Sequence, residues 1–155
     1  MSNLENAKAF FEASESGEGW GACKQYCAPN AIFRCQAWIF HPPLASEPNL
    51  GGKLQNYVEW MKTIAREVFP KCYVDDVVSA YDEKSCTAFI SAVFNGTHTN
   101  TPEGVALPQP TNKSCASDYV YRIHFNAEGK IDSLLKIWNS EWAAMEMGWM
   151  DQIME

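Results

Sequence analysis

The sequence predicts an α+β domain in which helices cover one face of a curved antiparallel sheet. Amphipathic helical segments fill most of the first half of the chain, and strand-like segments separated by short turns fill the second. Strongly twisted sheets curl, and a long amphipathic helix across a curled sheet leaves a concave mouth. A ligand-sized pocket in that mouth is the expected functional site.

The bulk composition indicates one globular domain spanning residues 1–155. The chain has 155 residues, of which 46% are hydrophobic and 13% aromatic, enough for one packed core. No internal repeat and no low-complexity linker divides it.

Charge and signal content narrow the expected partners. With 12 basic and 19 acidic residues the formal net charge is −7, which disfavours binding to nucleic acid and to anionic membranes. No basic leader and no run of 18 apolar residues is present, so we expect a cytoplasmic protein that does not span a membrane. The six cysteines are then expected to be reduced thiols.

The first helix is expected over residues 2–16, because Ser2 and Glu5 have the spacing of a capping box. Its apolar stripe consists of Leu4, Ala7, Phe10 and Phe11. After a glycine-rich break at residues 17–21, a helical pattern runs from Trp20 to Cys27 and stops at Pro29.

A strand is expected over residues 31–38 and a loop over residues 41–52, where prolines and glycines cluster. The clearest helix covers residues 54–69 and ends at Pro70. Its apolar stripe consists of Leu54, Tyr57, Val58, Met61, Ile64, Ala65 and Val68.

Four strands are expected in the second half, at residues 72–81, 86–99, 117–125 and 130–138. A proline-rich loop at residues 100–113 separates the second from the third. A short closing helix is expected to carry Trp142, Met145 and Trp149 on one side.

Several segments together resemble the SnoaL-like polyketide cyclases of the nuclear transport factor 2-like superfamily. They are YCAPNAIF at residues 26–33, NGTHT at 95–99, PTNK at 110–113, DYVYR at 118–122, EGKI at 128–131 and KIWN at 136–139. The resemblance implies a cone-shaped α+β barrel, a homodimer packed through its sheet, and an apolar cavity that holds one acidic or imidazole group. The superfamily contains cyclases, isomerases, dehydratases, epoxide hydrolases and proteins without activity, so fold leaves function open.

By that resemblance an aspartate lies on the strand before the Gly-Lys-Ile turn, and a histidine follows a Gly-Thr pair. His98 matches the histidine, and Asp118 is the acidic residue of that strand. Counting back from Gly129, however, puts Tyr121 where the family aspartate falls. Three residues of offset also reverse the face of the strand.

The chemistry expected of such a pocket is removal of a proton next to a carbonyl, with a hydrogen-bond donor stabilising the enolate oxygen. Asp118 is the candidate base, with His98 or Tyr121 as the donor. The candidate pocket lining is aromatic and apolar: Phe33, Trp38, Tyr57, Trp60, Met61, Tyr119 and Trp138.

Structural roles compete with each of these assignments. Asp118 shares its strand alternation with Arg122 and His124, which is typical of a solvated face, whereas Tyr119 and Tyr121 share the face expected to be buried. His98 is equally consistent with a surface or hydrogen-bonded histidine. Cys23 and Cys27 stand at helical spacing but lack the further ligands of a zinc site, so we expect no metal and no cofactor.

Two functions follow as hypotheses. The first is a cofactor-independent cyclase or isomerase acting on a small apolar carbonyl compound. The alternative is a non-catalytic small-molecule-binding or dimerisation module of the same fold. Epoxide hydrolysis, which needs two carboxylates bridged by an arginine, has little support in the sequence.

Overall fold

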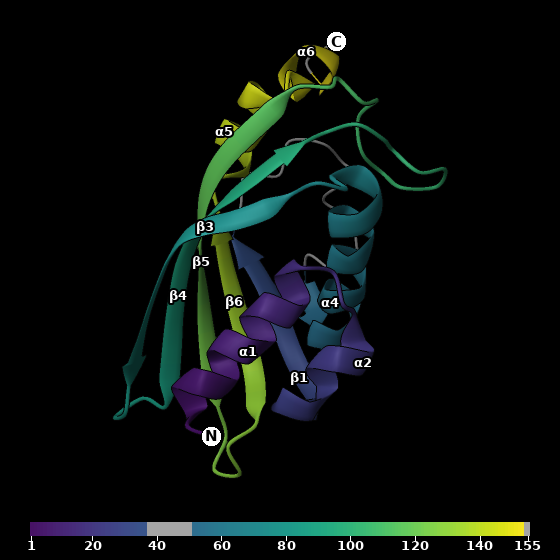
Figure 1. Cartoon of the computed structure of the whole chain (residues 1–155). Coiled ribbons are helices and arrows are strands. Elements are labelled where there is room, and N and C mark those ends of the chain that lie inside the picture. The colour runs from purple at the N-terminus through teal and green to yellow at the C-terminus, as the bar shows by residue number, and fades with distance from the viewer. Residues whose placement is uncertain (37–50, 154–155) are drawn as a thin grey trace.

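The computed structural model describes residues 1–36 and 51–153, which form a six-stranded sheet with helices on its concave face (Figure 1). The strand order is β2-β1-β6-β5-β4-β3. The expected α+β class is confirmed. The predicted Trp38 and most of the predicted loop at 41–52 lie outside the described residues.

The first helix, α1 (Asn3–Glu15), begins as expected at a capping box. The Ser2 hydroxyl accepts from the Glu5 backbone N–H, and the Glu5 carboxylate accepts from the Ser2 N–H. The helix then ends at Glu15, because Gly17 turns the chain with a φ of 75°.

The next segments are shorter than the sequence suggests. α2 (Trp20–Cys23) and the 3₁₀ turn η1 (Lys24–Tyr26) lead into β1 (Cys27–Gln36), which starts before the predicted strand. Gly51 and Gly52 were expected in a loop but belong to β2 (Gly51–Lys53), which pairs antiparallel with β1.

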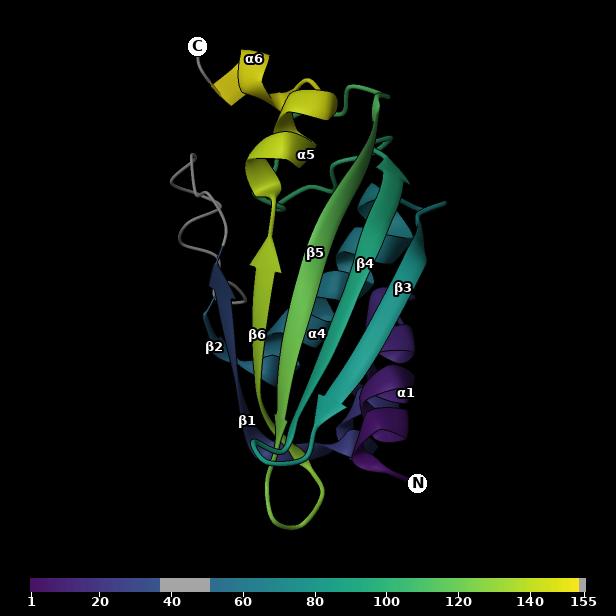
Figure 2. The same ribbon diagram turned by 90° about the vertical axis from the view of Figure 1, so that its left-hand side faces the viewer.

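The long amphipathic helix is present as α4 (Leu54–Thr63) followed without a break by a π-helical turn, η3 (Ile64–Val68). Its predicted stripe is buried against the sheet. α1 and α4 both lie behind the strands in Figure 2, which leaves the opposite, convex face of the sheet uncovered by the described helices.

The remaining strands follow in order: β3 (Tyr73–Asp82), β4 (Thr87–Thr97), β5 (Ser114–Phe125) and β6 (Ile131–Trp138). They form an antiparallel meander, as predicted. The expectation of a wholly antiparallel sheet is wrong at one place, because β1 pairs parallel to β6. Between β1 and β6 the chain passes through β2, α4 and the whole meander, a long connection of the kind that parallel pairing needs.

The closing helix is two short helices, α5 (Ser140–Glu146) and α6 (Trp149–Ile153). Gly148, with a φ of 73°, separates them. The predicted common stripe is therefore wrong, since Trp142 and Met145 are exposed whereas Trp149 is buried. No helix among the described residues combines the length and apolar character needed to cross a membrane.

Candidate active site

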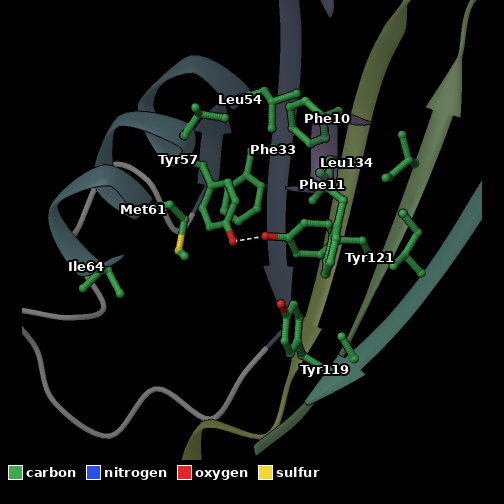
Figure 3. Close-up of a cluster of buried hydrophobic side chains, with 14 of the residues drawn as sticks. Phe10, Phe11, Phe33, Leu54, Tyr57, Met61, Ile64, Tyr119, Tyr121 and Leu134 are labelled. Carbon is green, nitrogen blue, oxygen red and sulfur yellow. Dashed lines mark hydrogen bonds between the residues drawn. The ribbon is translucent and has the colours of Figure 1, made fainter. Parts of the chain in front are cut away.

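A buried carboxylate and three buried phenols meet under the concave face of the sheet. Glu15, the last residue of α1, is only 5% exposed. Its Oε2 accepts a 3.0 Å hydrogen bond from the Tyr119 hydroxyl, and its Oε1 accepts one from the Tyr121 hydroxyl. Tyr57 of α4 extends the group, because its hydroxyl is hydrogen-bonded to that of Tyr121 (Figure 3).

A buried cation completes this cluster. The Lys136 ammonium of β6 donates a 3.1 Å hydrogen bond to the Tyr57 hydroxyl. It also lies 5.1–5.2 Å from the ring centroids of Tyr57, Tyr119 and Trp138, within the range of cation–π attraction. We refer to Glu15, Tyr57, Tyr119, Tyr121 and Lys136 as the buried polar cluster.

Local packing fixes the orientation of the phenols. The ring of Tyr57 stacks on that of Phe33 with a centroid separation of 4.1 Å, and Phe11 meets Tyr121 edge to face at 5.3 Å. Tyr119 and Tyr121 alternate with exposed residues along β5, so both phenols point to the concave side. The hydroxyls are therefore held where Glu15 arrives from α1.

Burial shifts the protonation equilibria of the cluster. It raises the pKa of the Glu15 carboxyl, while Lys136 and the two tyrosine hydrogen bonds act in the opposite direction. Burial lowers the pKa of the Lys136 ammonium, which Glu15 opposes. The phenol pKa values of Tyr57 and Tyr121 are well above normal because of burial and the neighbouring carboxylate, so both phenols are hydrogen-bond donors at neutral pH.

A pocket of about 360 Å³ opens beside Glu15, between α1 and β3. It is lined by Lys8, Phe11, Glu12, Glu15, Ser16, Val74, Val77 and Ile90. The register of β3 shifts between Asp75 and Val78, and Asp76 in this bulge has a φ of 52°. The pocket thus joins apolar walls to one buried carboxylate, the combination that suits proton abstraction from an apolar compound.

Asp118 lies outside this arrangement. It is exposed on β5, on the face opposite Tyr119 and Tyr121. The solvated position that its alternation with Arg122 and His124 indicated is the one observed, and the structure does not bring Asp118 near the buried cluster. Tyr121, the residue at the family aspartate position by counting, is the one that points inward.

His98 is buried, but it belongs to a different group of residues. Its Nδ1 accepts a 2.8 Å hydrogen bond from the indole N–H of Trp149, and its Nε2 lies 2.7 Å from the Thr101 hydroxyl. Because the Thr101 hydroxyl donates to the carbonyl of Pro108, it accepts from the histidine N–H. His98 is therefore a neutral tautomer that ties the loop after β4 to α6, and the hydrogen-bonded interpretation fits better than a surface position.

The predicted pocket residues are mostly core. Phe33, Tyr57, Met61 and Tyr119 are buried, and Trp60 and Trp138 are half-buried. Cys23 ends α2 whereas Cys27 begins β1, so the two thiols do not share a helix. Within residues 1–36 and 51–153, no three His, Cys, Asp or Glu side chains are grouped to hold a metal ion.

Glu15 and Lys136 were not among the residues predicted from the sequence, although a signal for each exists. The stripe of α1 passes through Phe10 and Phe11, and one further turn reaches Ser14 and Glu15. Lys136 stands between Leu134 and Trp138 in the alternation of β6. Each is a charged residue at a position where the hydrophobic periodicity of its helix or strand predicts an apolar residue.

Comparison with known proteins supports the fold and leaves the activity open. No family model and no curated protein sequence matches the chain. Among solved structures, a protein from Pseudomonas putida KT2440, provisionally described as a polyketide cyclase, is similar over 95% of this chain and 98% of its own, with a TM-score of 0.68 and 16% identity.

Two further structures show the same likeness. A provisional SnoaL-like polyketide cyclase from Jannaschia sp. CCS1 aligns with a TM-score of 0.68 and 14% identity, over 94% of this chain and 90% of its own. AclR from Streptomyces galilaeus, provisionally described as a hydroxylase, aligns with a TM-score of 0.67 and 13% identity, over 94% and 84%. The chain has the fold of the SnoaL-like polyketide cyclases, as its sequence segments predict.

Proposed function

We propose that this protein is a cofactor-independent cyclase or isomerase that acts on a small apolar carbonyl compound. The observation that carries the proposal is the Glu15 carboxylate, buried beside an apolar pocket and hydrogen-bonded by two phenols. The likeness to polyketide cyclases is consistent with it, although it concerns the fold alone.

In this mechanism Glu15 removes the proton from the carbon next to the carbonyl. A raised carboxyl pKa makes Glu15 a stronger base than an exposed glutamate and brings its pKa closer to neutral pH. As Glu15 becomes neutral, the phenols that donated to its oxygens are freed to donate to the enolate oxygen. Glu15 thus takes the role of base that the sequence suggested for Asp118, and Tyr119 and Tyr121 take the donor role, for which the sequence offered His98 or Tyr121.

The test is deuterium exchange at the acidic CH₂ groups of 2-tetralone, a small apolar ketone, followed by NMR in D₂O. The native protein should accelerate exchange over buffer, and Glu15→Gln should reduce the acceleration by at least about 100-fold. Asp118→Asn is the matched control, because it removes an exposed carboxylate from the opposite face, and it should exchange like the native protein. Retained exchange in Glu15→Gln would exclude Glu15 as the base.

The alternative is a binding module without turnover. It is favoured by the fact that both carboxylate oxygens of Glu15 already have phenol partners. In that case 2-tetralone or a similar ketone should bind, as seen by ligand-induced shifts in the protein NMR spectrum, but exchange should equal that in buffer.

A further inference from the structure

The buried polar cluster contains a continuous chain of hydrogen bonds from a cation to a carboxylate. Lys136 donates to Tyr57, Tyr57 is bonded to Tyr121, and Tyr121 donates to Glu15. A phenol has one hydrogen, and that of Tyr121 is directed at Glu15. The hydrogen between the two phenols therefore belongs to Tyr57, and every donor in the chain points towards Glu15.

The two ends of this series of hydrogen bonds lie in different surroundings. Glu15 borders the pocket between α1 and β3, whereas Lys136 lies across the core on β6. Tyr57 and Tyr121 between them are 2% and 0% exposed, but Lys136 is 8% exposed and its neighbour Trp138 is only half-buried. A ligand in the pocket would cover the side of Glu15 that faces the pocket. Glu15 could then exchange protons only through the hydrogen-bonded phenols.

We propose that Tyr121, Tyr57 and Lys136 form a proton relay that exchanges protons with Glu15 from the side remote from the pocket. This inference rests on the proposed function, because it supplies the step that follows proton abstraction by Glu15. Lys136 touches no part of the pocket, so it acts through the two phenols as a positioning residue and proton carrier.

Atoms and charges balance for proton transfer in both directions along these hydrogen bonds. When protonated Glu15 gives its proton to the Tyr121 oxygen, Tyr121 gives its own to Tyr57 and Tyr57 gives its own to a neutral Lys136 amine. The products are a Glu15 carboxylate and a Lys136 ammonium. In the reverse direction the ammonium releases a proton to Tyr57, and the chain delivers one to Glu15, leaving a neutral amine. Net charge in the core is the same in both states.

The surroundings of Lys136 lower the pKa of its ammonium from the usual range of a lysine. The titratable groups around it are Glu15 of α1, Tyr57 of α4, Tyr119 and Tyr121 of β5, and Cys35 of β1. Burial, which disfavours the ammonium, acts against Glu15, which favours it. A surface lysine near neutral pH would stay charged and would not accept a proton.

The first test needs no substrate. In protein labelled with ¹³C at the tyrosine Cζ atoms, we expect the signals of both Tyr57 and Tyr121 to shift at one pH midpoint, that of Lys136. Lys136→Met should abolish this step, and Lys130→Met, which removes an exposed lysine, should retain it. Tyr57→Phe should reduce the Tyr121 step to the part that the Lys136 charge, 5.9 Å from the ring centroid, causes through space, as judged against the step in Tyr119. A Tyr121 step of undiminished size in Tyr57→Phe would show that the whole effect acts through space and would overturn the relay.

Lys136→Arg separates proton transfer from charge. Arginine keeps the cation and its hydrogen-bond donors but does not lose a proton at accessible pH. We expect Lys136→Arg to fold, to lose the pH step, and to slow deuterium exchange of saturating 2-tetralone about 10- to 100-fold with little change in KM. Exchange at the native rate would limit Lys136 to a structural role and contradict the relay.

The two proposals fail in different ways. If the native protein exchanges no 2-tetralone deuterium, the proposed activity on ketones fails, and the tyrosine titration still decides whether the phenols and Lys136 are coupled. If exchange occurs but the titration shows no coupling, the activity stands and the relay falls. Should Lys136→Met not fold, because buried Glu15 loses the nearby positive charge, Lys136→Arg carries the test.

Discussion

Glu15 shows how one side chain at the end of a helix acquires an unusual environment. The negative end of the α1 dipole, the low dielectric of the core and the absence of bulk water all disfavour a carboxylate there. Four groups compensate: the Lys136 ammonium and the hydroxyls of Tyr121, Tyr119 and Tyr57. A glutamate at this position in a helix is ordinarily solvent-exposed, which is why its role is not apparent from residue type.

His98 gives a prediction about pH. Burial lowers the pKa of His98 below the ordinary 6.5. Just below that pH, His98 is therefore protonated to a larger extent in the unfolded chain than in the folded protein. Stability from this residue is therefore present above the ordinary pKa and is lost as the pH falls below it. Protonation would also place a hydrogen on Nδ1, which accepts from Trp149.

We expect the free energy of unfolding, measured in urea, to decrease between pH 7 and pH 5. The decrease should be larger for the native protein than for the His98→Gln variant. An identical decrease in His98→Gln and the native protein would contradict the assignment.

At the scale of elements, the strand β4 ends in a close approach that only glycine permits. A Cβ atom on Gly96 would lie 2.9 Å from Phe94 Cε1 and 3.0 Å from Phe69 Cδ1. These two rings pack edge to face, and Phe69 also contacts His98. Gly96, which has no side chain, is thus the point around which three parts of the fold pack. They are the end of β4, the residue that follows η3 and His98.

Gly96→Ala should therefore destabilise the protein by about 1–3 kcal/mol, since added volume in a packed region forces neighbouring rings to move. Gly21→Ala is the control, because no atom lies within 4 Å of its added Cβ and the residue is in a helix. Thermal unfolding should show a lower Tm for Gly96→Ala only. An unchanged Tm would mean that the rings move aside at no cost.

The elements themselves were largely predictable. The capping box marked the start of α1, and the apolar stripe marked α4, because these signals are local in sequence. The parallel pairing of β1 with β6 and the short β2 depend on contacts between distant segments, which local patterns do not encode. The same reason explains why Glu15 and Lys136 were missed although Tyr57 and Tyr121 were predicted: the four residues come from four elements that only the fold brings together.

At the scale of the whole molecule, the convex face of the sheet has the character of an interface. Four large apolar residues on it are exposed: Ile32, Val78, Phe89 and Ile137. No helix in the described part of the chain covers this face (Figure 2). Asp118 and Arg122 lie on it at either side of Val120. A two-fold axis near Val120 would place Asp118 of each copy beside Arg122 of the other.

We propose that a second copy of the chain covers this face. Light scattering after gel filtration should give a dimer for the native protein and a monomer for Asp118→Arg or Arg122→Asp alone. The double variant should restore the dimer, because the charges are exchanged but remain complementary. Met145→Arg, on exposed α5, is the control and should stay dimeric. A monomeric native protein would exclude this interface.

The pairing of β1 with β6 also has a consequence for the order in which the chain acquires its structure. β3, β4, β5 and β6 are neighbours in both sequence and space, so they can assemble across two short turns and the loop between β4 and β5. The pairing of β1 with β6, in contrast, brings Cys27 beside Ile131 and must wait until β6 has emerged from the ribosome. Glu15 likewise gains the hydroxyls of Tyr119 and Tyr121 only after β5, about 100 residues further along the chain, has been made.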